Sequence, residues 1–118
     1  MLKREDMGAD RVTLFYGIRF QVTDSEEISL LNVRKHPLVK TAKKHGLDHY
    51  WGNFGQDGND FTLLYIGRDL GEFGHEGKFE TEISDDEFAK IRRDTAKRIK
   101  EAGFSLVPAL FVQFEPDV

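Results

Sequence analysis

The segment RVTLFYGIRFQV, from Arg11 to Val22, constrains the fold more than any other part of the chain. Apolar and mixed positions alternate along it, which is the spacing of a β-strand and not of a helix. One side is apolar throughout, whereas the other side carries Thr13, Phe15, Gly17, Arg19 and Gln21. We therefore expect a strand in a sheet that helices cover on the apolar side and leave partly open on the other.

Two helical segments are expected directly after this strand. Residues 23–25 offer side chains that cap a helix N-terminus, and two glutamates follow where the helix dipole favours acids. Pro37 disfavours helical backbone at His36, so the first helix should end before it. A second helix should then run from Pro37 to Gly46, because proline suits the first turn of a helix and glycine the position just after its end.

Two extended segments, 47–55 and 61–67, flank the pair Asp57 and Gly58. This pair accepts the backbone angles of a tight hairpin turn, so a β-hairpin is predicted. The alternation of charged and uncharged residues in 78–83 favours a short additional strand at a sheet edge.

The clearest helix of the sequence begins at Ser84. Glu87, three residues later, completes a capping box, and the helical spacing of apolar residues continues to Gly103. Apolar and other side chains then alternate in the segment 105–117, which predicts a last strand. Pro108 indicates that the first part of this strand lies at a sheet edge or in a bulge.

The expected order is thus strand, helix, strand, strand, a short extra strand, helix and strand. This is the split βαβ pattern called ferredoxin-like, a two-layer α+β sandwich with an antiparallel sheet and its helices on one face. A chain of 118 residues suits a single domain spanning residues 1–118, in which residues 1–10 form a flexible polar lead-in.

The composition limits the classes of function. The chain has no cysteine, which excludes disulfides, thiolate metal sites and a cysteine nucleophile. It has no apolar run of membrane-spanning length, and its net charge of −4 gives no overall attraction for a phosphate backbone. We expect a cytoplasmic protein without a cofactor.

The segment YIGRDLGEFGHEG, residues 65–77, contains four glycines and is predicted to be a mobile loop between Gly67 and Gly77. It lacks the lysine and the following helix of a phosphate-binding loop. No metal is expected, and Asp69, Glu72 and His75 are the candidate ligands if one binds. Phe73 is predicted either to anchor the loop in the core or to contact a partner.

The mixed side of the sheet is the predicted interaction surface. Phe15 and Arg19 of the first strand and Phe111 and Gln113 of the last should lie there, with Phe73 nearby. A sheet face with this much apolar surface is seldom bare in a monomer, so a homodimer or another protein partner is expected. Stacking of RNA bases on these aromatic residues is an alternative, although the third strand lacks the motif of RNA-recognition modules.

The expectation for function is therefore a non-enzymatic interaction or regulatory module that self-associates through its open sheet face. The enzyme alternative is a small metal-assisted or general-base activity. It would use the Gly67–Gly77 loop or the two histidines His45 and His49, which lie near Asp48 in the sequence. RNA binding is the third alternative.

Overall fold

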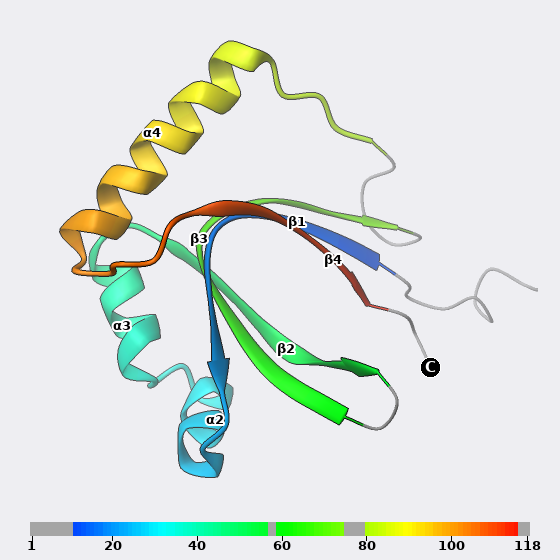
Figure 1. The fold of residues 1–118 in the computed structure, drawn as a ribbon, viewed down its shortest axis with the longest axis vertical. Coiled ribbons are helices and arrows are strands. Elements are labelled where there is room, and N and C mark those ends of the chain that lie inside the picture. Colours follow the sequence, from blue (N-terminus) through cyan, green and yellow to red (C-terminus); the bar gives the residue numbers. More distant parts are fainter. Residues whose placement is uncertain (1–10, 57–58, 75–79, 116–118) are drawn as a thin grey trace, which may run out of the picture.

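The computed structural model describes residues 11–56, 59–74 and 80–115. They form an α+β domain in which four antiparallel strands lie in the order β2-β3-β1-β4 and three helices accompany the sheet (Figure 1). None of the described helices combines the length and apolar character that a membrane span requires. The elements are β1 (Arg11–Val22), α2 (Ser25–Asn32), α3 (Pro37–Lys44), β2 (Asp48–Gln56), β3 (Asn59–Gly74), α4 (Asp85–Glu101) and β4 (Ala109–Glu115).

The alternation of the first strand is confirmed, and its apolar side supplies the main core. Ile18 and Val22 pack there with Leu64 and Ile66 of β3 and with Ile99 of α4. The remaining buried members of this cluster come from the helices and the segment after α3, namely Leu31, Val39, Ala42 and Leu47. Burial of these side chains is what holds the helices on this face of the sheet.

Strands β1 and β3 bend sharply, so that the sheet wraps around its other face (Figure 1). At the bend Gly17 lies directly opposite Gly67. A Cβ atom on Gly17 would lie 2.8 Å from the Cα of Gly67, and one on Gly67 would lie 2.6 Å from the Cα of Gly17. Only glycine permits two backbones to approach this closely, so this pair allows the bend.

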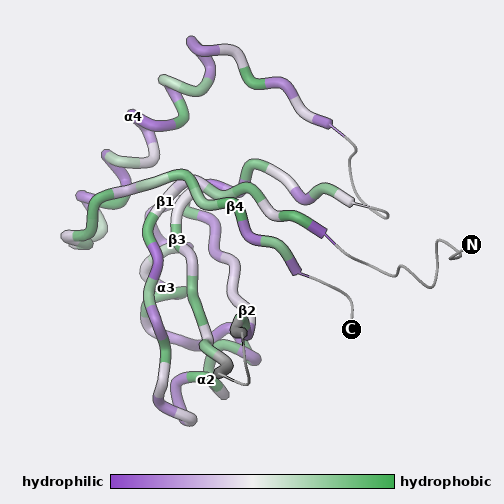
Figure 2. The backbone as a smooth tube through the Cα atoms, turned by 45° about the vertical axis from the view of Figure 1, so that its right-hand side comes forward, coloured by the Kyte–Doolittle hydropathy of each residue, from purple (hydrophilic) through white to green (hydrophobic). Residues whose placement is uncertain are grey.

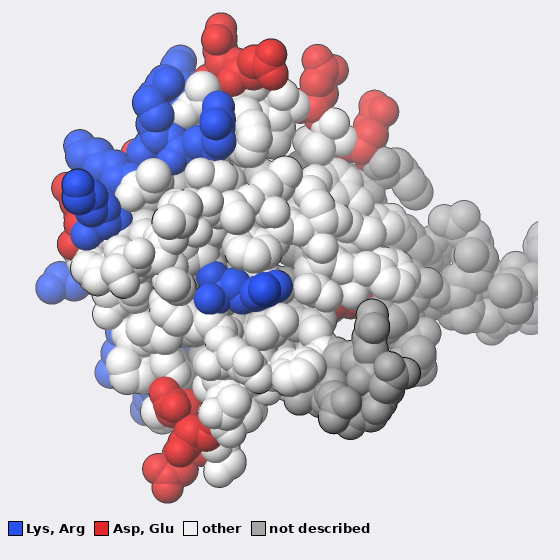
Figure 3. Space-filling model, viewed as in Figure 1, with Lys and Arg blue, Asp and Glu red and all other residues white. Residues whose placement is uncertain are grey.

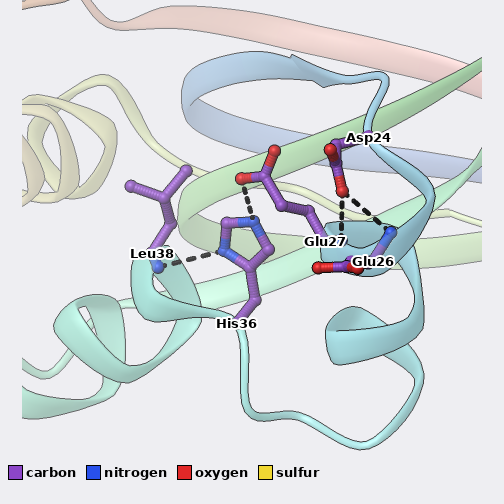
Figure 4. A network of polar contacts seen from close by, with 5 residues as sticks. All are labelled: Asp24, Glu26, Glu27, His36 and Leu38. Carbon is purple, nitrogen blue, oxygen red and sulfur yellow. Dashed lines mark hydrogen bonds and ion pairs between the residues drawn. The ribbon is translucent and has the colours of Figure 1, made fainter.

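The helix starts follow the expected capping chemistry (Figure 4). The side chain of Asp24 accepts hydrogen bonds from the N–H groups of Glu26 and Glu27, at 2.8 and 3.1 Å. His36, which is buried, caps α3 because its Nδ1 accepts the N–H of Leu38 at 3.1 Å, and its Nε2 lies 3.2 Å from Oε1 of Glu27. One histidine therefore starts α3 and ties it to α2.

Helix α4 also begins as predicted, since the hydroxyl of Ser84 accepts the N–H of Glu87 at 3.1 Å. Acidic side chains fill its first turn, and Arg98 and Lys100 lie in its last turn. Figure 3 shows the resulting separation, with negative charges over the first part of α4 and positive charges over its C-terminal part. This arrangement complements the helix dipole.

All three helices end with the same pair of backbone hydrogen bonds, the Schellman motif. In this motif one residue adopts a left-handed conformation, and glycine is the usual choice. Gly46 after α3 and Gly103 after α4 have φ values of 69° and 90°. After α2 the position is occupied by Arg34, with φ 59°, and its N–H donates to the carbonyl of Leu31 at 3.1 Å.

The hairpin of β2 and β3 is confirmed, because Gln56 pairs with Asn59 across the predicted turn. The turn residues 57 and 58 and the lead-in 1–10 lie outside the described residues. Two other predictions are wrong. Residues 67–74 of the predicted loop are the second half of β3, and residues 80–83 of the predicted strand 78–83 are not a strand. Residues 75–79 lie outside the described residues.

The reason for the first error is that the glycines of this segment serve a strand. Gly71 and Gly74 have φ values of 131° and 145°, and both still pair with β1. The register between β1 and β3 shifts at Leu14 and Phe15, which leaves Leu70 without a partner in the ladder. Such a bulge is a common use of glycine inside a strand.

Candidate functional site

The predicted metal ligands do not converge in the described part of the chain. Oδ1 of Asp69 accepts the N–H of Gly71 at 2.9 Å, whereas Oε2 of Glu72 lies 3.7 Å from Nη1 of Arg11. His75 lies outside the described residues. Among those that are described, no three side chains of metal-binding type form a cluster.

The predicted interaction face is occupied by its own aromatic side chains. Phe15 and Tyr65 are each only 1% exposed, and their rings pack 6.0 Å apart. Tyr50, Phe111 and Phe54 also belong to the cluster, with ring centres 5.4, 5.2 and 6.3 Å from that of Tyr65. The prediction that Phe15 belongs to an accessible surface is thus wrong, because the bend of the sheet buries it, and its ring is not available for stacking on a base.

The two polar residues predicted on this face hold the cluster in place. The guanidinium carbon of Arg19 lies 5.1 Å from the ring centre of Phe111, a cation–π geometry. The hydroxyl of Tyr65 donates to Oε1 of Gln113 at 2.9 Å. Arg19 is exposed and Phe111 and Gln113 are partly exposed, so the outer rim of this face is accessible while its centre is not.

Phe73, the remaining predicted contact residue, is partly buried and lies on β3 opposite Val12. Its ring lies beside Gly71, where a Cβ atom would come within 3.2 Å of its Cζ. The ring therefore covers the strand backbone next to the bulge.

Two hydroxyl groups are buried on the aromatic side of the sheet without hydrogen bonds to described residues: those of Thr13 and Tyr50. Burial raises the pKa of Tyr50 well above its ordinary value, the carboxylate of Glu115 raises it further, and Thr13 and Arg11 act in the opposite direction. Tyr50 is therefore a neutral phenol at physiological pH.

A groove of about 870 Å³ lies between α3, the start of β2 and the bulged part of β3. This groove was not among the features predicted from the sequence. Its charged and polar lining comprises Arg34, Lys40, Lys43, Asp48, His49 and Asp69, and its apolar lining comprises Val39, Leu47 and Leu70. The volume is in the range of sites for small molecules.

The two carboxylates of the groove are held by the backbone. Oδ2 of Asp48 accepts the N–H of Asp69 at 2.9 Å, and Asp69 in turn accepts the N–H of Gly71. These bonds join the start of β2 to the bulge of β3 and fix the shape of the groove at that end.

His49 is half-buried at the groove, and burial lowers its pKa from the ordinary value. Arg34 lowers it further, while Asp48 opposes both. The side chain of His49 is thus neutral at physiological pH and offers one donor and one acceptor nitrogen.

Strand β4 also has an accessible surface. It is an edge strand and pairs only with β1 among the described strands. Leu110, Val112 and Phe114 lie opposite Tyr16, Leu14 and Val12, on the side of the sheet that carries the helices. They are nevertheless 47%, 64% and 52% exposed, because α4 packs over β1 and β3 instead. Leu106 and Val107, directly before β4, are exposed as well.

No family model, no curated protein and no solved structure matches this chain.

Proposed function

We propose that this protein is a non-enzymatic interaction module that self-associates through β4 and the segment before it. The observation that carries the proposal is the exposed apolar strip formed by Leu106, Val107, Leu110, Val112 and Phe114. An apolar surface of this kind on a small protein is typical of an interaction site. Figure 2 shows hydrophobic residues before β4 and again within it, where they alternate with hydrophilic ones.

A second copy of the same chain is the partner that the strip fits best. Edge strands usually carry charges that prevent them from pairing with other molecules, but no charged residue lies between Ala109 and Phe114. The surface along β4 is mostly uncharged in Figure 3, apart from a basic side chain beside it. Arg19 of β1 lies over the ring of Phe111. Two β4 strands related by a two-fold axis would therefore pair without opposing like charges.

The pairing would bury the strip from both copies and satisfy the outward backbone groups of β4. A specific interface needs about 1,000 Å² of buried surface. Five large exposed side chains from each copy, together with the strand backbones, are of the right order for such an area.

The fold class within this proposal is the ferredoxin-like one. The strand order β2-β3-β1-β4 supports it, as do the helices between β1 and β2 and between β3 and β4. The class itself implies no particular activity. A cytoplasmic location, which the cysteine-free sequence suits, is also part of the proposal.

The test is the molar mass in solution, measured by size-exclusion chromatography with light scattering over a range of protein concentrations. We expect a dimer for the unmodified chain and a monomer for Val112→Asp, whose charge would lie within the buried apolar strip. Val33→Asp is the matched control, because Val33 is 58% exposed at the end of α2, and it should remain dimeric. A monomer at every concentration, or a dimeric Val112→Asp variant, would contradict the proposal.

A further inference from the structure

The groove beside α3 has a charge pattern that the self-association of β4 does not explain. Three cations line it, Arg34, Lys40 and Lys43. The ion pairs of the described residues involve Arg11, His36 and Arg98, and none of the three groove cations takes part in one. The groove carboxylates Asp48 and Asp69 are engaged by backbone N–H groups instead.

The backbone at Arg34 gives an independent reason to regard the groove as a site. Arg34 occupies the left-handed position of a Schellman motif, where the other two described helices have Gly46 and Gly103. A long side chain in this conformation is strained, and residues held in such conformations cluster at ligand-binding positions. The strained residue is also the one that brings a guanidinium group to the groove.

The lining also indicates the character of the ligand. The guanidinium group of Arg34 matches the oxygens of a phosphate or carboxylate, and the two lysines add point charges next to it. The three cations outnumber the carboxylates of Asp48 and Asp69, so the lining keeps a net positive charge that favours an anion such as a phosphate monoester. Leu70, which is partly exposed, provides apolar contact for the rest of the molecule, and the neutral His49 provides a hydrogen bond.

We infer that this groove binds a small organic phosphate monoester, with its phosphate at Arg34, Lys40 and Lys43 and its organic part against Leu70. The inference is independent of the oligomeric state, because the groove lining contains no residue of β4 or of the segment before it.

The test is an NMR titration of the backbone amides with phenyl phosphate, with inorganic phosphate and phenol as separate arms. We expect saturable shifts confined to amides near Arg34, Lys43 and Gly71 with phenyl phosphate. Inorganic phosphate should shift the same amides with lower affinity, and phenol should shift none of them. The inference would be overturned if phenol without a phosphate group gave the same saturable shifts. It would also be overturned if the shifted amides were those of lysines scattered over the surface.

Variants assign the binding to the groove. Arg34→Gly removes the guanidinium group and relaxes the backbone. If this variant binds phenyl phosphate more weakly, the loss of affinity is therefore not a consequence of unfolding. We expect Arg34→Gly and Lys43→Gln each to lower the affinity for phenyl phosphate by about tenfold or more, which is the effect of losing a charged hydrogen bond. Lys35→Gln removes the same charge from the residue next to Arg34, outside the groove lining, and should leave the affinity unchanged. Equal affinity of all three variants and the unmodified chain would overturn the inference.

Discussion

Gly17 of β1 lies directly opposite Gly67 of β3 at the bend of the sheet, and neither position has room for a side chain. The bend that this pair permits lets Phe15 and Tyr50, whose ring centres are 6.4 Å apart, pack on the same face. The burial of Phe15 thus follows from two glycines in the middle of two strands.

The first prediction concerns Gly17→Ala. The new methyl group would meet the backbone of Ile66 and Gly67, which no side-chain rotation can relieve. We expect the free energy of unfolding to fall by about 3 kcal/mol, at the upper end of the cost of overpacking. Urea denaturation measures it.

Gly103→Ala is the control for Gly17→Ala, because nothing lies within 4 Å of a Cβ at Gly103. Only its left-handed backbone opposes the substitution, at a cost of about 1 kcal/mol. Equal losses for the two variants would show that the close approach of β1 and β3 is not the constraint.

The second prediction is that Arg34→Gly stabilises the protein. Glycine removes the strain of the left-handed conformation at φ 59°, so the free energy of unfolding should rise by about 1 kcal/mol. Thermal and urea denaturation both report the gain. Gly103→Ala, a change in the reverse direction at the matching position after α4, should lower stability. A loss of stability in Arg34→Gly would show that the left-handed backbone of Arg34 is not strained.

The third prediction concerns the cap of α3. His36→Ala removes both the acceptor for the N–H of Leu38 and the contact with Glu27, and it leaves a cavity at a buried position. We expect a loss of about 2 kcal/mol in a urea unfolding experiment. His36→Asn retains a capping side chain and should recover part of this loss. No difference between the two variants would mean that capping is not the role of His36.

The fourth prediction concerns alkaline pH. Burial raises the pKa of Tyr50 and of Tyr65 in the folded protein, whereas an unfolded tyrosine ionises at about pH 10. Below that pH both states keep the proton and stability does not depend on these groups. Above it the unfolded chain loses protons that the folded chain retains, so the free energy of unfolding should fall as the pH rises.

The variant Tyr50→Phe should show a shallower fall above about pH 10. At pH 7 it should match or exceed the unmodified protein in stability, because the hydroxyl of Tyr50 has no hydrogen-bond partner among the described residues. Tyr65→Phe is the comparison, since it loses the bond to Gln113 and should cost about 1 kcal/mol at pH 7. An unchanged alkaline slope in Tyr50→Phe would contradict this account.

Local patterns were sufficient to predict much of the fold. The alternation of Arg11–Val22, a helix cap within residues 23–25, the cap at Ser84 and the break at Pro37 each depend on neighbouring residues, and the structure confirms them. The hairpin of β2 and β3 was predictable for the same reason, because its turn chemistry is local.

Features that depend on distant parts of the chain were not predictable in this way. Residues 67–74 have the glycine content of a loop, and only pairing with β1 makes them a strand. The burial of Phe15 requires the bend, which brings together residues far apart in sequence. The groove beside α3 was missed because Lys40 and Lys43 are typical of a solvated helix face, although arginine in the glycine position after α2 was a signal in the sequence.

The most direct test of the central proposal is hydrogen exchange of the backbone amides in β4 as the protein concentration is raised. Those amides that do not bond to β1 face outward, and pairing with a second copy would protect them. We predict that their exchange slows with concentration, whereas exchange along β2, the other edge strand, does not change. Exchange in β4 that is rapid and independent of concentration would contradict self-association through this strand.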